Sequence, residues 1–203
     1  MNARLAIVLA MLLLACSEQG KTPLPDGAKA LGIAPVFSYA LLPDGGALIY
    51  SDGADLVLRD LATGREVCLT GLDPDAKRKG EPGEKERQPG AELFPAVSPD
   101  GRFIAFAAWR RNDNADRTDD KDCDIWLLAF DDALRAGLAD PKNLKPVEGS
   151  TRQLYVGQLE LVQATNVKAV DETMPAWDPL FPRLYAVGAG KALLSFDVSR
   201  LVR

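Results

Sequence analysis

Short apolar runs separated by turn residues recur along the chain from residue 36 onward. The runs are about five to seven residues long and rich in β-branched and aromatic side chains, a pattern typical of β-strands. Pro-Asp-Gly triplets stand at residues 43–45 and 99–101. Proline presets φ, aspartate bonds to the nearby backbone and glycine accepts a positive φ, so each triplet predicts a tight turn. The pattern therefore predicts an all-β fold of antiparallel meanders.

One motif occurs in three copies, and the copies divide the domain into units. Residues 94–99 read Phe-Pro-Ala-Val-Ser-Pro, and residues 174–179 read Met-Pro-Ala-Trp-Asp-Pro. Each copy is followed by an alternating apolar run and then by a second apolar run that ends in Phe-Asp. A third copy begins at residues 42–45. The predicted units span about 36–70, 93–156 and 170–203, and they must stack because one meander cannot bury both of its faces.

This repeat resembles the blade repeat of TolB-type β-propellers. The match is close over residues 95–106 together with 124–127, and fair over residues 43–50. It is degenerate over residues 175–187, where Leu180, Phe181 and Pro182 replace the Asp-Gly of the turn. The resemblance implies a β-propeller over roughly residues 36–200. It says little about the ligand, since propellers host many functions.

The number of copies departs from the family pattern. Pro43, Pro99 and Pro179 mark three blades, whereas propellers normally close with four to eight. Three arrangements stay open: a homodimer that completes six blades, an open arc capped by its own loops, and a shortened relative or fragment of a longer gene product. Because propellers often close by pairing their two ends, the resemblance implies that a strand at residues 33–39 completes the last unit.

Residues 1–15 predict an export signal. Arg4 precedes an apolar run at residues 5–15 that is too short to span a bilayer and fits the apolar region of a secretory signal. Residues 13–16, Leu-Leu-Ala-Cys, resemble a bacterial lipobox, which implies cleavage before Cys16 and acylation of its thiol. The alternative is an ordinary signal cut after an alanine. A lipid on Cys16 would hold the chain at a membrane surface through a tether at residues 16–35. The resemblance implies the outer membrane, facing the periplasm, because Ser17 rather than an aspartate follows the cysteine.

Composition excludes several classes of function. Acidic side chains outnumber basic ones by 29 to 24, so the formal net charge of −5 argues against a nucleic-acid-binding surface. The chain has no histidine, which excludes Ser-His and Cys-His nucleophile pairs and histidine-ligated zinc. We therefore expect a protein that is not an enzyme. Trp109, Trp126 and Trp177 are expected to pack in the core or between blades rather than to stack on a ligand.

An acidic segment at residues 112–124 is a candidate calcium site. The candidate ligands, at positions one, three, five and nine of a calcium loop, are Asn112, Asn114, Asp116 and Asp120. TolB-like repeats often carry a calcium-loop-like insertion here, so the resemblance supports Ca²⁺. Arg117 stands where the loop has glycine and Cys123 where it has glutamate. The alternative is a solvated acidic turn.

Two further expectations concern the middle of the chain. Residues 132–138 predict one or two helical turns packed at a blade edge. Cys68 and Cys123 remain once Cys16 is lipidated, and an oxidising periplasm permits a disulfide between them across adjacent blades. The alternative is two separate thiols, one of them buried.

Three functions follow from these features. The first is a lipoprotein whose propeller-like domain binds or scaffolds another envelope protein. The second is an accessory structural lipoprotein with a calcium-rigidified loop. The third is a hydrolase that uses carboxylates alone, which would need two acids of unequal pKa in one pocket.

Overall fold

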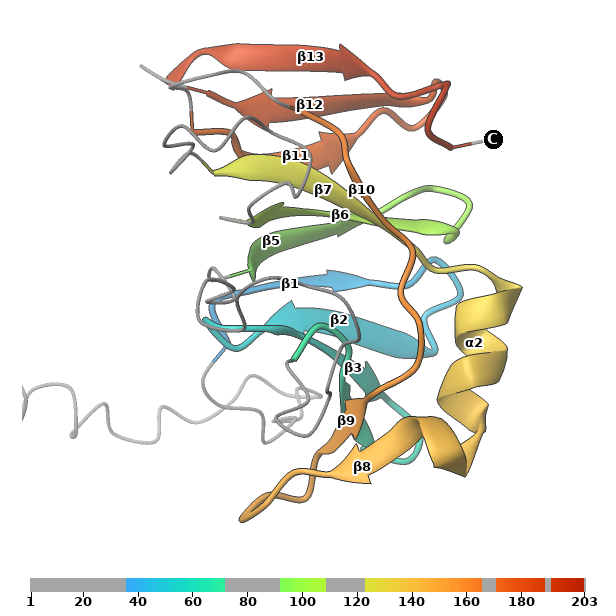
Figure 1. Cartoon of the computed structure of the whole chain (residues 1–203). Coiled ribbons are helices and arrows are strands. Elements are labelled where there is room, and N and C mark those ends of the chain that lie inside the picture. The colour runs from blue at the N-terminus through green and yellow to red at the C-terminus, as the bar shows by residue number, and fades with distance from the viewer. Residues whose placement is uncertain (1–35, 72–91, 109–122, 166–170, 189–190, 203) are drawn as a thin grey trace, which may run out of the picture. The chain divides into compact units, whose positions relative to one another are not determined.

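A computed structural model describes residues 36–71, 92–108, 123–165, 171–188 and 191–202. Ala34–Arg203 forms one compact unit, and its described part holds three sheets (Figure 1). The described strand pairs are antiparallel apart from one parallel pair. This confirms the predicted all-β fold of antiparallel meanders. Within the described ranges, no helix is both long and apolar enough to cross a membrane.

The first sheet begins as a meander of four strands. They are β1 (Ser38–Leu41), β2 (Ala47–Ser51), β3 (Leu56–Asp60) and β4 (Glu66–Cys68). The predicted Pro-Asp-Gly turn joins β1 to β2, where the Asp44 carboxylate accepts the Gly46 N–H at 2.8 Å and Gly45 has a φ of 71°. In the turn between β3 and β4, the Asp60 carboxylate accepts the Thr63 N–H at 2.7 Å. The turn residues therefore set the register of this meander.

The second and third copies of the motif build the other two sheets. The middle sheet contains β5 (Glu92–Val97), β6 (Phe103–Ala108), β7 (Asp124–Ala129) and β10 (Leu161–Gln163), and the third contains β11 (Thr173–Trp177), β12 (Arg183–Val187) and β13 (Leu193–Asp197). Phe94 and Met174 have left-handed φ values of 56° and 52°, and the pairing shifts register beside each. Each is followed by a proline, which cannot donate to the ladder. The sequence repeat is therefore also a repeat of backbone conformation.

The predicted limits of the middle unit, 93–156, are corrected by the sheet topology. β8 (Leu144–Pro146) and β9 (Gln153–Tyr155) join the first sheet, where β9 runs parallel to β4. β10 lies outside the predicted limits and pairs with β7. The reason is that the helical segment after β7 leads the chain to the open edge of β4, which the β8–β9 hairpin then extends. The predicted closing strand, residues 33–39, is also corrected in the part that the structure describes, because Ser38 and Tyr39 belong to β1, which pairs with β2 of its own sheet.

The helical segment confirms the prediction for residues 132–138. α2 (Asp132–Ala139) begins after Asp131, whose carboxylate accepts the Leu134 N–H at 3.0 Å as an N-cap. Leu134 and Leu138, four residues apart, are buried on one face of the helix. Both belong to the core between the first and middle sheets. A short 3-10 turn, η1 (Pro141–Asn143), leads into β8.

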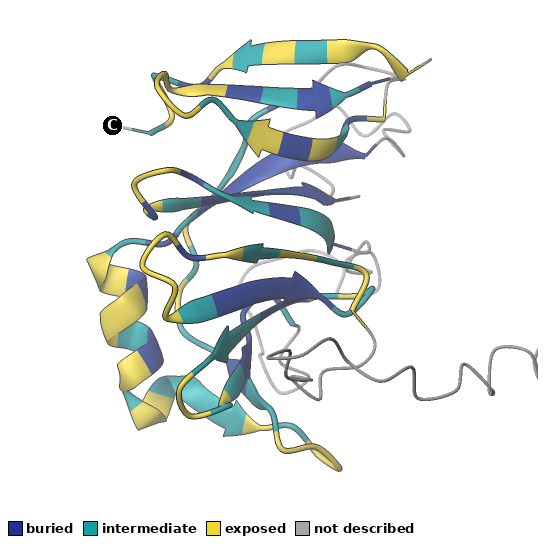
Figure 2. Ribbon diagram, turned by 180° about the vertical axis from the view of Figure 1, so that it is seen from behind, coloured by how far each residue is buried: buried dark blue, intermediate teal, exposed yellow. Residues whose placement is uncertain are grey.

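The two central strands of the middle sheet, β6 and β7, are buried at nearly every position (Figure 2). Along β6, Ile104 and Phe106 enter the core shared with the first sheet, whereas Ala105 and Ala107 enter a second core shared with Leu184 of β12. This alternation explains why β6 is apolar at consecutive positions, because strands covered on both faces need no polar side. Residues of β13 alternate between exposed and half-buried, as expected for a strand that packs through one face only. The face-to-face succession of sheets is the arrangement predicted for a partial propeller.

An ion-pair network attaches the β8–β9 hairpin to the first sheet. Arg152 donates from Nη1 to Asp52 at 2.7 Å and from Nε to Glu66 at 3.0 Å. Glu66 also accepts from Arg59 at 2.8 Å and from the Tyr50 hydroxyl at 3.0 Å. The Arg152 guanidinium lies 5.7 Å from the centroid of the Tyr50 ring. These contacts join residues 86 and 100 positions apart in the chain.

Candidate functional site

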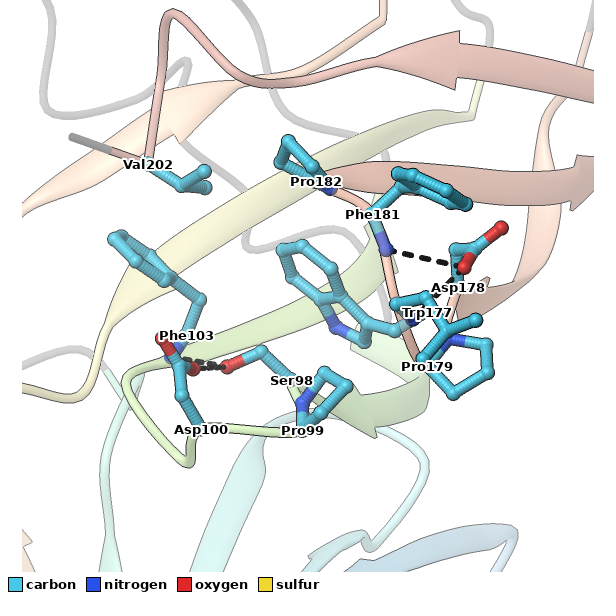
Figure 3. A pocket seen from close by; sticks show the side chains of 11 residues that line it. Ser98, Pro99, Asp100, Phe103, Trp177, Asp178, Pro179, Phe181, Pro182 and Val202 are labelled. Atoms are coloured by element: carbon cyan, nitrogen blue, oxygen red, sulfur yellow. Dashed lines mark hydrogen bonds between the residues drawn. The ribbon is translucent and has the colours of Figure 1, made fainter.

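Two copies of the repeated motif face one another across a pocket between the middle and third sheets (Figure 3). The pocket has a volume of about 270 Å³. It is lined by Ser98, Pro99, Asp100, Phe103, Trp177, Asp178, Pro179, Leu180, Phe181, Pro182 and Val202. Most of these side chains are apolar, and the polar ones belong to the two turns that form its walls.

The first wall is the turn between β5 and β6. The buried Ser98 hydroxyl donates to the Asp100 carboxylate at 2.6 Å and accepts the Phe103 N–H at 2.9 Å. Asp100 also accepts the Arg102 N–H at 3.1 Å. Gly101 closes the turn with a φ of 71°, which glycine adopts without strain. The wall is therefore held rigid by the Ser-Pro-Asp-Gly residues themselves.

The second wall is the corresponding turn between β11 and β12. The Asp178 carboxylate accepts the N–H groups of Leu180 and Phe181 at 2.9 and 3.1 Å, and the Tyr185 hydroxyl donates to it at 3.1 Å. These bonds hold the loop so that Leu180 is 81% exposed and Phe181 is 61% exposed. Because the two side chains are adjacent and lie beside the apolar lining of the pocket, they form a contiguous exposed apolar patch, which is the kind of surface that marks a binding site.

Trp177 joins the two walls. Its indole N–H donates to the Ala96 carbonyl at 3.0 Å, which ties the third sheet to the middle one. Its ring lies 6.4 Å from that of Phe103, at an interplanar angle of 37°. Because the indole N–H is already engaged, Trp177 offers the pocket an apolar ring face. The expectation that Trp177 packs between units is confirmed, and the same residue also lines the pocket.

Hydrogen bonds favour the ionised form of the two carboxyl groups of the pocket, those of Asp100 and Asp178. Burial alone would raise the pKa of Asp100, but the hydrogen bonds from Ser98 and Arg102 outweigh it and hold the pKa below its ordinary value. The pKa of Asp178 is lowered by the N–H of Leu180 first, with further hydrogen bonds from Tyr185 and Phe181. Neither group has the raised pKa that a general acid needs at neutral pH. The pocket is therefore suited to binding an apolar group beside a cation.

The sequence shows a departure from the repeat at one wall of this pocket but does not predict the pocket. Where the middle copy turns through Asp100 and Gly101, the third copy has Leu180, Phe181 and Pro182. A turn that replaces its most polar residues with exposed apolar ones is a signal for a binding surface. What the sequence did not show is that the two turns lie opposite one another.

The predicted lipid-attachment and calcium residues lie outside the described part of the chain. This applies to Cys16 and to the candidate calcium ligands Asn112, Asn114, Asp116 and Asp120. At the end of the same acidic segment, the buried Asp124 accepts a hydrogen bond from Gln163 at 2.7 Å. Among the residues that the structure describes, no three acidic or cysteine side chains are grouped as metal ligands.

The predicted disulfide between Cys68 and Cys123 is corrected, because the structure has both as free, buried cysteines. Cys68 ends β4 and packs beside Leu154 of the first sheet, since a Cβ placed on Gly71 would lie 2.7 Å from a side-chain atom of each. Cys123 belongs instead to the core between the middle and third sheets. Burial raises the pKa of each thiol to about 12. Both cysteines are therefore protonated and unreactive at neutral pH.

Comparison with known proteins gives similarity at the level of solved structures. No protein-family model and no curated protein matches the chain. A putative TolB from Agrobacterium tumefaciens is 20% identical, with a TM-score of 0.45 over 76% of this chain and 38% of its own. TolB from Acinetobacter baumannii is 17% identical, with a TM-score of 0.39 over 78% and 31%. An oligogalacturonate lyase in complex with manganese is 16% identical, with a TM-score of 0.44 over 83% and 40%. The chain spans less than half the length of each, and similarity at this level carries no argument about activity or partners.

Proposed function

We propose that this chain is a protein-binding domain of the bacterial envelope, and that it holds an extended, proline-rich segment of a partner in the pocket between the middle and third sheets. The observation that carries the proposal is the exposure of Leu180 and Phe181, 81% and 61%, at the lip of an apolar pocket. Burying such side chains against a partner contributes about 1.5–3 kcal/mol each.

The shape and chemistry of the pocket favour a polyproline-type segment. Trp177, Phe103 and the three prolines of the lining form flat apolar walls. Grooves lined in this way bind segments already in the extended polyproline conformation, because such segments lose little entropy on binding. The anionic Asp100 and Asp178 at the walls add a preference for a lysine or arginine next to the apolar residues.

The membrane part of the proposal comes from the N-terminal sequence. The lipobox-like residues 13–16 favour acylation of Cys16, and Ser17 favours the outer membrane. A lipid there would keep the binding domain at the surface of the membrane, within reach of other envelope proteins. The absence of histidine and the low pKa of both pocket carboxyls support a binding function over a hydrolase.

The test uses the full chain in lipid vesicles and a synthetic proline-rich decapeptide that carries one arginine. Trp177 reports on the pocket, so binding should change the tryptophan fluorescence in a saturable way. Phe181→Ser should weaken binding about tenfold or more, because it removes apolar area from the lip. Phe37→Ser is the matched control, since Phe37 is similarly exposed, at 66%, but lies on the first sheet.

Replacing the arginine of the peptide by glutamate should also weaken binding, because the pocket carboxylates would repel it. Equal affinity for the Phe181→Ser and Phe37→Ser variants would refute the pocket as the binding site. No saturable change at millimolar peptide would refute the polyproline proposal and favour the accessory structural role.

A further inference from the structure

The outer edge of β13 is a candidate site of self-association because no described strand pairs with it. In the third sheet the strand order is β11-β12-β13, and no described strand pairs with the far side of β13. β13 lies at the end of the sheet in both views (Figures 1 and 2). In the middle sheet, by contrast, β10 covers the corresponding edge of β7.

The other described edge strands carry features that prevent pairing with another chain. β5 and β11 each contain a proline and a register shift. β8 and β10 have three residues each, and β8 ends in Pro146. β1 lies in contact with β5 of the middle sheet. Short strands, prolines and bulges are the usual means by which proteins avoid edge-to-edge association.

β13 lacks these features. Its five residues pair with β12 in unbroken register, and none is proline or lysine. Leu193 at its start is 73% exposed. A regular edge strand with an exposed leucine is a template for another strand.

The direction of the free backbone groups follows from the pairing with β12. The Val198 N–H donates to Pro182 at 3.0 Å, and the Gly188 N–H donates to Ala192 at 2.8 Å. Because inward and outward groups alternate along an antiparallel strand, Leu194 and Phe196 also point toward β12. The N–H and C=O groups of Leu193, Ser195 and Asp197 therefore point away from the sheet, toward the open side.

We propose that β13 pairs antiparallel with β13 of a second copy, about a two-fold axis at Ser195. In this register Leu194 lies opposite Phe196 of the second copy, which forms an apolar cross-strand pair on the inner face. Leu193 lies opposite Asp197 of the second copy, so no like charges meet.

This dimer differs from a six-bladed ring. Ring closure would pack the outer face of the third sheet on the first sheet of the other chain, and it would leave the edge of β13 unused. Edge pairing instead joins two three-stranded sheets into one continuous sheet. The two arrangements therefore depend on different groups and can be separated by changing the edge alone.

The first test compares Ser195→Pro with Ser195→Ala in the full chain in detergent, by light scattering across a concentration series. Proline removes the outward N–H of residue 195 and spares the bonds to β12, whereas alanine keeps that N–H. Two intermolecular hydrogen bonds are lost per dimer, so Ser195→Pro should weaken association about 10- to 100-fold, with Ser195→Ala close to the wild type. Circular dichroism checks that both variants fold.

The second test is a cysteine at the proposed axis. Ser195→Cys should form an intermolecular disulfide under mild oxidation, because hydrogen-bonded residues across an antiparallel pair lie about 5.5 Å apart between Cα atoms. Ser199→Cys, half-buried and beyond the strand, is the control and should not cross-link efficiently. A monomeric wild type, a dimer equally stable in Ser195→Pro, or equal cross-linking at both positions would overturn the proposal.

Discussion

Replacing Arg152 by methionine should destabilise the described domain by about 2–4 kcal/mol. Methionine keeps the apolar stem that packs on Tyr50 and removes the guanidinium. Two charge-assisted hydrogen bonds are lost, each worth about 1.5–3 kcal/mol, together with a cation–π contact of about 0.5–2 kcal/mol. The loss is smaller than the sum because both carboxylates keep other donors. Glu66 retains Arg59 and Tyr50, and Asp52 retains the backbone N–H groups of its own turn.

The same contacts predict how this difference depends on pH. Burial alone would raise the pKa of both carboxyl groups, but hydrogen bonds outweigh it and lower both. Asp52 accepts from the N–H groups of Asp55 and Ala54 and then from Arg152, whereas Glu66 accepts from Arg59 and then from Arg152 and Tyr50. A carboxyl whose pKa is lowered by folding contributes stability above its unfolded pKa, about 4, and loses it as the pH falls through the lower folded pKa. The stability gap between wild type and Arg152→Met should therefore be full at pH 7 and shrink below about pH 4.

Urea unfolding followed by circular dichroism measures this gap, with Arg200→Met as the control. Arg200 is exposed, and no ion pair is described for it, so its replacement should change stability by less than about 0.5 kcal/mol. A double-mutant cycle with Glu66→Gln isolates the coupling between the two side chains. A loss for Arg152→Met no larger than that of the control, or a gap unchanged between pH 7 and pH 3, would refute the assigned role of the network.

Three further predictions concern the helix and the cysteines. Gly137→Ala should destabilise the domain by about 1–3 kcal/mol although alanine favours helices, because the new Cβ would lie 2.4 Å from the Tyr155 hydroxyl. In a Tyr155→Phe background the cost should shrink, because the nearest remaining ring atom lies 3.3 Å away, and an equal cost there would contradict the clash. Asp131→Ala should cost about 1 kcal/mol in urea unfolding through loss of the N-cap, and an unchanged midpoint would show that the cap contributes nothing. Cys68 and Cys123 should react with a thiol reagent only in denaturant, and rapid labelling of either of these two residues in the native chain at pH 8 would disprove its burial.

The local elements were predictable because their signals lie within a few residues. Pro-Asp-Gly at residues 43–45 places its own turn, and alternation of apolar residues specifies which positions of β12 face the core. Repetition of the motif allowed the three-sheet organisation to be inferred, because similar segments fold into similar units. The helix at α2 was likewise visible from its own residues.

Pairings between distant segments were not predictable in this way. Nothing near residues 144–155 indicates that this hairpin joins the first sheet, since the decisive contacts join Arg152 to Asp52 and Glu66. The predicted bridge between Cys68 and Cys123 failed for the same reason. Their positions in adjacent units said nothing about which core each thiol enters.

The sequence by itself determined an all-β chain of repeated meanders, their turns, and the replacement of Asp-Gly by apolar residues at 180–182 in the third copy. Tertiary structure decided which strands share a sheet, that two motif copies line one pocket, and that no described strand covers the outer edge of β13. The physical reason is the distance along the chain over which each kind of interaction acts. Turn and strand preferences act through bonds and contacts within a few residues, whereas sheet order and pockets depend on which distant faces bury the most apolar surface together.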